Sequence, residues 1–305
     1  MLDGLILGVD IGGTKTALML WDRARETVLV QDSFETPADA GPEALVEAVA
    51  AECERLLAGC ARSFADLRAV GMAVPGQVDA AGGRVLVSGN LAGWVDVPLR
   101  ELVEARFGTP AAIEHDANAA ALGEQWRGAA QGMATFAFVA LGTGVGVGIV
   151  IDGRLHRGAH HAAGELGDLV VSRAFLGQER AGQGNLAQLI GGKTLRRRAQ
   201  RVTGAELSAA EAIAFAEEDE ALAALADDVA DYLAMALIAV AALLDPEAIV
   251  VGGGTAEAGE DLLDPVRERL ACEVAAPPLL IASALGPEAQ LYGAVFCALH
   301  ALYTP

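Results

Sequence analysis

The chain has 305 residues, of which 41 are acidic and 21 basic, so its formal charge is −20 at pH 7. Such a charge repels a phosphate backbone and disfavours nucleic acid as a partner. The longest apolar run, residues 232–244, is too short to span a membrane. The first residues lack the features of a secretory signal, and the four cysteines form no CxxC pair. We therefore expect a cytoplasmic protein without a membrane partner.

Apolar runs and turn residues predict the elements of the first half. In chain order these are a three-stranded antiparallel meander within 5–30, a helix at 41–61, a strand at 67–76, a helix near 97–108 and a strand that ends near residue 115. Pro42 suits the first turn of the first helix, and Gly59 suits its end.

Residues 135–153 repeat the opening pattern of strand, glycine turn and strand, at an offset of roughly 130 residues from the first copy. This similarity and the length of the chain predict two related lobes, each with a glycine hairpin that can present backbone N–H groups to phosphates. Beyond residue 190 the pattern is mainly helical, with a strand and three glycines at 246–254 and a final helix at 291–303.

The first glycine hairpin, DIGGTKT, carries polar groups suited to a nucleotide. Asp10 offers a carboxylate for hydrated Mg²⁺, while Gly12, Gly13, Thr14 and Lys15 offer amide, hydroxyl and ammonium donors for phosphate oxygens. The alternative is an ordinary hairpin. Two further glycine segments favour a nucleotide site, and they comprise Gly142, Thr143, Gly144, Gly252, Gly253 and Gly254.

The segment AIEHDANAAALGE places Asp116 where a strand delivers a side chain into a cleft. A carboxylate there can accept a hydroxyl proton during phosphoryl transfer, and the alternative is a helix N-cap. Asn90, in the loop VSGNLAGW, suits the hydroxyls of a sugar, although a turn asparagine is equally consistent with the sequence.

Six segments together resemble the ROK family of bacterial sugar kinases and sugar-responsive repressors, in order and spacing over nearly the full chain. They are LGVDIGGTKT, GMAVPGQVDAAGGRVLVSGNLAGW, EHDANAAALGE, ALGTGVGVGIVIDGRLHRGAHHAAGELGD, VVGGG and LYGAVFCAL. The resemblance implies an α/β, two-lobed, actin-like ATPase (ribonuclease H-like) fold with duplicated lobes. It also implies a small lobe of residues 1–117 plus about 288–305, and a large lobe of 118–287.

The same resemblance implies a role for each motif. The three glycine segments would bind ATP, Asp10 would hold Mg²⁺ through water, and Asp116 would be the catalytic base. Asn90 and Glu165 would contact sugar hydroxyls. The implied reaction transfers the γ-phosphoryl group to a hexose hydroxyl, at C6 of glucose or a related sugar, and the implied assembly is a homodimer or homotetramer.

The sugar end departs from the family pattern. His115 replaces an asparagine that normally contacts sugar, and Asp168 replaces a histidine that touches sugar and binds a structural zinc. The cysteines that normally follow are absent, so we expect no zinc. The last glutamate of that segment aligns with Ala187, which leaves Gln188 or Glu179 as substitutes.

These changes leave two rival hypotheses open. One is a non-catalytic or weakly catalytic sensor of sugar or nucleotide with a degenerate sugar site, and the other is an actin-like ATPase with a different acceptor. His160 and His161, in the turn before Glu165, fit surface positions better than sugar contacts.

Overall fold

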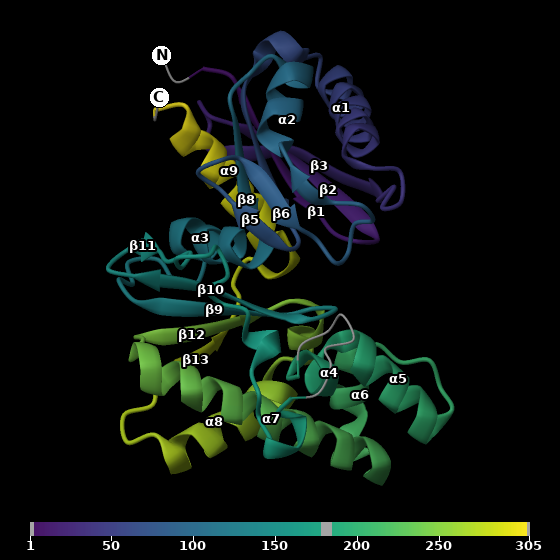
Figure 1. Ribbon diagram of the computed structural model, residues 1–305, viewed down its shortest axis with the longest axis vertical. Helices are drawn as coiled ribbons and strands as arrows, with labels where there is room; N and C mark the ends of the chain where they lie inside the picture. Colours follow the sequence, from purple (N-terminus) through teal and green to yellow (C-terminus); the bar gives the residue numbers. More distant parts are fainter. Residues whose placement is uncertain (1–2, 178–184, 304–305) are drawn as a thin grey trace. The chain divides into compact units, whose positions relative to one another are not determined.

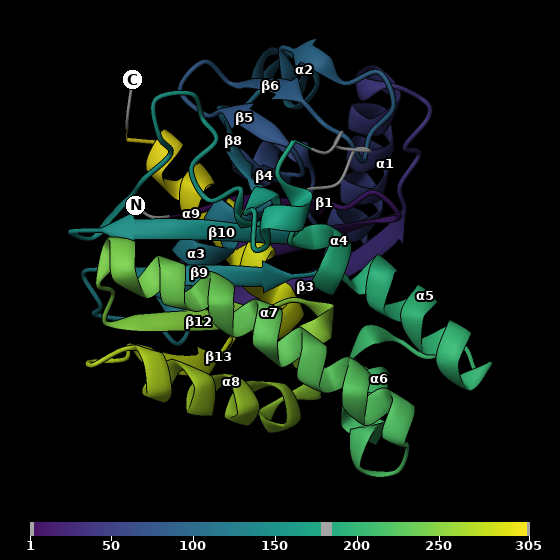
Figure 2. The same cartoon turned by 60° about the horizontal axis from the view of Figure 1, so that its bottom comes forward.

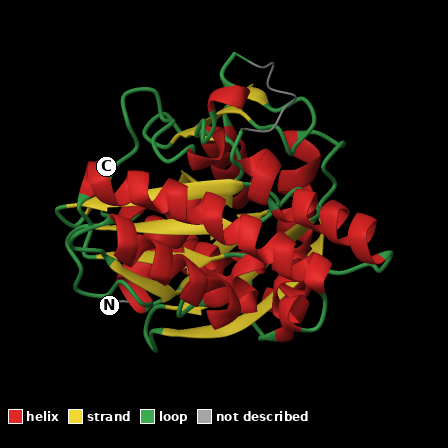
Figure 3. Cartoon of the chain, turned by 90° about the horizontal axis from the view of Figure 1, so that it is seen from below, coloured by secondary structure: helices red, strands yellow, loops and turns green. Residues whose placement is uncertain are grey.

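The computed structural model describes residues 3–177 and 185–303. Its contacts divide the chain into two units, one of Met1–Arg127 with Glu288–Pro305 and the other of Gly128–Pro287. Each unit is built on a five-stranded sheet with helices packed against it (Figure 3). The division falls after a helix that begins at Asp116, whereas the boundary expected from the sequence falls near its start, because this helix packs on the C-terminal helix of the first unit.

The main sheet of the first unit has the order β3-β2-β1-β4-β8. The first three strands are antiparallel, as predicted, and β4 and β8 run parallel to β1. The bounds are β1 (Leu5–Ile11), β2 (Lys15–Asp22), β3 (Thr27–Glu35), β4 (Leu67–Val74) and β8 (Ala111–His115). A smaller sheet contains β5 (Gln77–Asp79), β6 (Arg84–Val87) and β7 (Val95–Val97), and the helices are α1 (Pro42–Gly59), α2 (Leu99–Phe107), α3 (Asp116–Arg127) and α9 (Ala289–Ala301).

Helices cover both faces of this sheet, with α1 and α2 on one face and α9 on the other (Figure 1). Alternate residues of β1 point to opposite faces, so Leu7 and Val9 pack with α1 whereas Ile6 packs with α9. Glycine lets α9 approach closely, since a Cβ at Gly71 would lie 1.9 Å from the carbonyl oxygen of Ala294. The α9 helix thereby supports both the sheet and α3.

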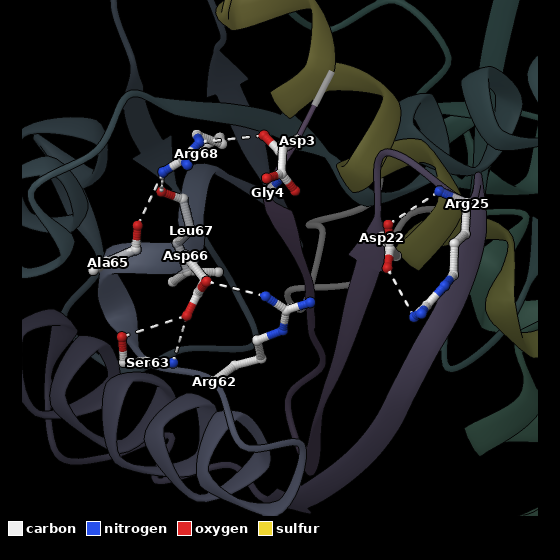
Figure 4. Close-up of polar contacts among 10 residues, drawn as sticks. All are labelled: Asp3, Gly4, Asp22, Arg25, Arg62, Ser63, Ala65, Asp66, Leu67 and Arg68. Carbon is white, nitrogen blue, oxygen red and sulfur yellow. Dashed lines mark hydrogen bonds and ion pairs between the residues drawn. The ribbon is translucent and has the colours of Figure 1, made fainter. Parts of the chain in front are cut away.

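Polar contacts order the connection between α1 and β4 (Figure 4). The Asp66 carboxylate accepts a hydrogen bond of 2.9 Å from the backbone N–H of Ser63 and lies 3.3 Å from the guanidinium of Arg62. Arg68 donates to the carbonyl oxygen of Ala65 at 2.9 Å. These contacts lie at the surface and satisfy backbone groups that the short turn leaves unpaired.

The second unit repeats the strand order and directions of the first, as β11-β10-β9-β12-β13. Here β9, β10 and β11 are antiparallel, β12 runs parallel to β9, and β13 runs parallel to β12. The duplicated fold expected from the sequence is therefore confirmed. The bounds are β9 (Phe136–Leu141), β10 (Val145–Ile151), β11 (Arg154–Leu155), β12 (Ala248–Gly252), β13 (Leu279–Ala282), α4 (Ala187–Ile190), α5 (Gly192–Thr203), α6 (Ala209–Ala214), α7 (Glu220–Leu244) and α8 (Glu260–Glu273).

The apolar run at 232–244 forms the C-terminal half of α7, which lies along the second sheet beside α8 (Figure 2). Leu233 and Leu237 are buried in the core of this unit with Val147 of β10. Across the described ranges, no helix combines the length and the apolar character that a membrane span requires.

Candidate active site

The carboxyl edge of the first sheet brings Asp10, His115 and Asp116 together. In the parallel register, Asp10 pairs with Ala73 of β4, and the next β4 residue pairs with His115 of β8. Asp116 follows at once as the first residue of α3, with no intervening loop. The fold therefore unites residues that lie about a hundred positions apart in the chain.

Asp10 and Asp116 interact electrostatically at this edge. Burial, together with repulsion from the Asp116 carboxylate, raises the pKa of Asp10 from 3.8 to about 7. Two neighbouring carboxylates that resist ionising together provide the hard oxygen ligands and the negative charge that a divalent cation favours. The residues present therefore fit the expected Mg²⁺.

One oxygen of Asp116 is held by its neighbours. Oδ1 accepts a hydrogen bond of 2.6 Å from the backbone N–H of Ala117 and lies 3.0 Å from Nε2 of His115. A helix N-cap would instead bond the N–H of the second or third helical residue. The contacts of Oδ1 leave Oδ2 as the oxygen with room for a further hydrogen bond.

Glu114 and Asn118 brace the junction between β8 and α3. The Glu114 carboxylate is 1% exposed and accepts hydrogen bonds of 3.0 Å from both the backbone N–H of His115 and the side-chain amide of Asn118. Neither residue was predicted from the sequence to belong to the site. The sequence signal for this arrangement was Glu114, a charged residue in the mostly apolar strand β8. A buried carboxylate requires hydrogen-bond donors nearby.

The first glycine turn lies beside Asn90. The backbone N–H of Gly12 donates to the carbonyl oxygen of Lys15 at 2.9 Å, which closes the turn between β1 and β2. A Cβ at Gly13 would lie 3.3 Å from the Cβ of Asn90, so this turn and the predicted sugar contact are neighbours. Trp94 is buried and anchors the loop that carries Asn90.

The other two glycine segments meet in the second unit. The backbone N–H of Gly142 donates to the carbonyl oxygen of Gly144 at 3.1 Å, and a Cβ on either glycine would meet open space. Gly253 has a φ of 91°, and a Cβ there would lie 2.7 Å from the carbonyl oxygen of Leu141. Glycine thus brings the turn after β12 against the end of β9, as a nucleotide site built from backbone requires.

A fourth segment, not predicted as part of the site, joins them. The backbone N–H of Gly192, the first residue of α5, donates to the carbonyl oxygen of Gly142 at 2.8 Å. A Cβ at Gly192 would lie 3.4 Å from the hydroxyl oxygen of buried Thr255. The signal in the sequence was the pair of glycines directly before Lys193.

Glu165 and Asp168 lie in a turn held against β10. The backbone N–H of Val147 donates to the carbonyl oxygen of Gly164 at 2.8 Å, and a Cβ at Gly164 would lie 1.8 Å from the carbonyl oxygen of Val147. Glu165 and Asp168 line a hollow of about 360 Å³ whose remaining walls are mostly apolar side chains of β10 and α7. His160, in the same turn, is exposed.

The segment that replaces the zinc site is only partly described. Ala187 is buried and is the first residue of α4. A Cβ at Gly167 would lie 3.2 Å from the Cβ of Ala187, so the turn that contains Gly167 packs against this helix. Gln188 follows within α4, whereas Glu179 lies outside the described residues. Among residues 3–177 and 185–303, no three His, Cys, Asp or Glu side chains gather in a way that could hold a metal ion.

Comparison with known proteins agrees with this arrangement. The model of the ROK family matches residues 6–300. Glucokinase from Halalkalibacterium halodurans is 31% identical over 286 residues, covering 88% of this chain and 86% of that one. Glucokinase from Streptomyces coelicolor is 34% identical over 292 residues, with 87% and 86% covered.

A solved structure extends the similarity to three dimensions. The ROK family glucokinase from Streptomyces griseus, in complex with glucose and AMPPNP, is 32% identical and superposes with a TM-score of 0.81, covering 97% of this chain and 100% of that one. The family resemblance and the actin-like fold expected from the sequence are confirmed. The chain belongs to the ROK family.

Proposed function

We propose that this protein is an ATP-dependent sugar kinase that transfers the γ-phosphoryl group of ATP to a hexose hydroxyl, at C6 of glucose or a related sugar. The observation that carries the proposal is the position of Asp116, with one oxygen held and the other available, in a chain similar to glucokinases. A sugar hydroxyl within reach of Oδ2 would be able to transfer its proton to this carboxylate.

Asp116 would act as the general base. As the hydroxyl oxygen of the sugar attacks the γ-phosphorus, its proton passes to the Asp116 carboxylate, and the bond between the γ-phosphorus and ADP breaks. The N–H of Ala117 and the imidazole of His115 would keep the acceptor oriented through Oδ1. Glu114 would act indirectly by holding the junction that carries Asp116.

The nucleotide would be bound chiefly by backbone. The N–H groups of the three glycine segments, with Thr14, Thr143 and Lys15, provide donors for phosphate oxygens. Mg²⁺, when bound, would offset the charge of the phosphates, and Asp10 would hold it through water. A nearby divalent cation favours the ionised form of Asp10, so its binding near neutral pH should release a proton.

The choice of sugar would depend on four side chains. These are Asn90, His115, Glu165 and Asp168. Each offers hydrogen-bonding groups suited to hydroxyls. An imidazole at 115 and a carboxylate at 168 present different donors and acceptors from the residues usual in the family, which supports an altered preference among hexoses.

The proposal is tested by ADP release, measured with coupling enzymes across a panel of hexoses, amino sugars and polyols. Asp116→Asn should lower kcat by about 10²- to 10⁴-fold while the protein stays folded and binds ATP. Asp39→Asn is the matched control, because it removes an exposed carboxylate of the same unit. If ATP binds but no acceptor stimulates ADP release, the kinase proposal is wrong and a sensor becomes the better description.

The assembly is a separate part of the proposal. We expect a homodimer or homotetramer, and light scattering coupled to size-exclusion chromatography measures the molar mass directly. A molar mass equal to the 31.2 kDa of one chain across the concentration range would contradict this expectation.

A further inference from the structure

Helix α5 carries a dense cluster of basic residues in this otherwise acidic protein. Five of its 21 lysine and arginine residues lie within residues 193–201, and no acidic residue occurs from 180 to 205. The whole chain carries a charge of −20, so this segment is an exception to its electrostatic character. A local concentration of cations of this kind attracts anions that the rest of the surface repels.

Three of these basic side chains and one glutamine share a face of α5 and line one cavity. Lys193, Arg196, Arg197 and Gln200 have the i, i+3, i+4 and i+7 spacing that aligns residues on a helix. They border a cavity of about 450 Å³, and residues 206–208 form its remaining wall. The cavity therefore has three cationic side chains on one wall and a single carboxylate, Glu206, on the other.

The cations in the cavity have no acidic partner in the part of the chain that the structure describes. Among residues 3–177 and 185–303, no carboxylate forms an ion pair within 4.0 Å with Lys193, Arg196 or Arg197, and Arg197 donates a long hydrogen bond of 3.4 Å to the Thr194 hydroxyl. Arg198, which does not line the cavity, instead forms an ion pair of 2.5 Å with Asp228. Three unpaired cations on one wall repel each other, and a multivalent anion would relieve that repulsion.

The position of the cavity identifies the class of anion. Lys193 directly follows Gly192, whose backbone N–H bonds to Gly142 in the second glycine turn. The cavity thus begins one residue after a glycine that contacts the second glycine turn, which is proposed to bind phosphate. We propose that the α5 cavity binds a linear chain of phosphate groups and so extends the donor site. This placement rests on the proposed nucleotide site, but binding of the anion can be measured without turnover.

Two sources could supply such a chain, namely the triphosphate of a nucleotide or inorganic polyphosphate. Both present several phosphate groups in a row, and guanidinium and ammonium groups bind these through charge-assisted hydrogen bonds. The shared chemistry is therefore a linear oligophosphate. The two donors can be compared directly in the same assay.

The first experiment measures binding of inorganic tripolyphosphate to the intact protein by isothermal titration calorimetry. Arg196→Gln should weaken binding by about tenfold, and Lys193→Gln combined with Arg197→Gln should weaken it further, because each substitution removes a charged hydrogen-bond donor. Arg201→Gln is the control, since it removes a cation of the same helix that does not line the cavity. Its affinity should stay within about twofold of the wild type.

The second experiment compares ATP with inorganic polyphosphate as phosphoryl donor for the same variants. A higher KM for ATP with little change in kcat identifies the nucleotide as the source, whereas loss of polyphosphate-dependent activity alone identifies the inorganic chain. The proposal is overturned if the cavity variants bind tripolyphosphate as the wild type does, or if Arg201→Gln weakens binding equally. If no donor supports turnover but tripolyphosphate binding depends on the cavity cations, the kinase proposal fails while this one stands.

Discussion

Asp10→Asn is expected to stabilise the first unit at alkaline pH while removing a group proposed to serve the reaction. Burial and the Asp116 carboxylate raise the pKa of Asp10 from 3.8 to about 7. As pH rises between these two values, the unfolded chain gives up its proton while the folded protein keeps it, so the free energy of unfolding falls. Above pH 7 the loss is complete, and asparagine avoids it.

The size of the effect follows from the pKa. Each pH unit between the two values corresponds to about 1.4 kcal/mol, which places an upper bound of about 4 kcal/mol on the gain. Asp10 is not fully buried, and water screens part of the interaction, so we expect about 2 kcal/mol. In a unit of this size, that free energy raises the midpoint of thermal unfolding by about 5 °C.

The measurement is calorimetric unfolding of the wild type, Asp10→Asn and the exposed control Asp39→Asn, at pH 8.5 and pH 5 without divalent cations. Asp10→Asn should raise the midpoint at pH 8.5, and its advantage should shrink toward pH 5, where less of the difference in proton binding has accumulated. A gain that is independent of pH, or an equal gain in Asp39→Asn, would refute the reasoning. A loss of stability in Asp10→Asn at pH 8.5 would do the same.

Three further predictions concern packing, specificity and metal. Gly293→Ala places a Cβ 1.7 Å from the carbonyl oxygen of Ala119, where α9 meets α3. This clash should lower the free energy of unfolding in urea by about 3 kcal/mol or more. An unchanged midpoint would contradict this packing. His115→Asn removes the imidazole beside Asp116 and should shift the ratio of kcat/KM between hexoses by about tenfold or more, and an unchanged ranking would exclude His115 as a determinant of sugar choice. Elemental analysis of the purified protein should find zinc well below one atom per chain, and stoichiometric zinc would contradict the expectation of a zinc-free protein.

Local patterns in the sequence predicted the elements that local interactions determine. Gly12 and Gly142 follow apolar strands, and both close tight turns in the structure, because the turn geometry depends on the few residues that form it. Pro42 and Gly59 begin and end α1 as predicted. The repeat at an offset of roughly 130 residues likewise predicted two related lobes, and the structure contains two sheets with the same strand order.

What the sequence determined by itself is therefore the glycine turns, the strands before them and the family to which their order belongs. Only the tertiary structure placed Asp116 beside Asp10 and α5 against Gly142. These arrangements depend on parallel strands and helix contacts between residues far apart in the chain, where loop closure and packing decide which segments meet. The raised pKa of Asp10 and the cationic cavity of α5 follow from that packing, because burial and the distance between charges are properties of the fold.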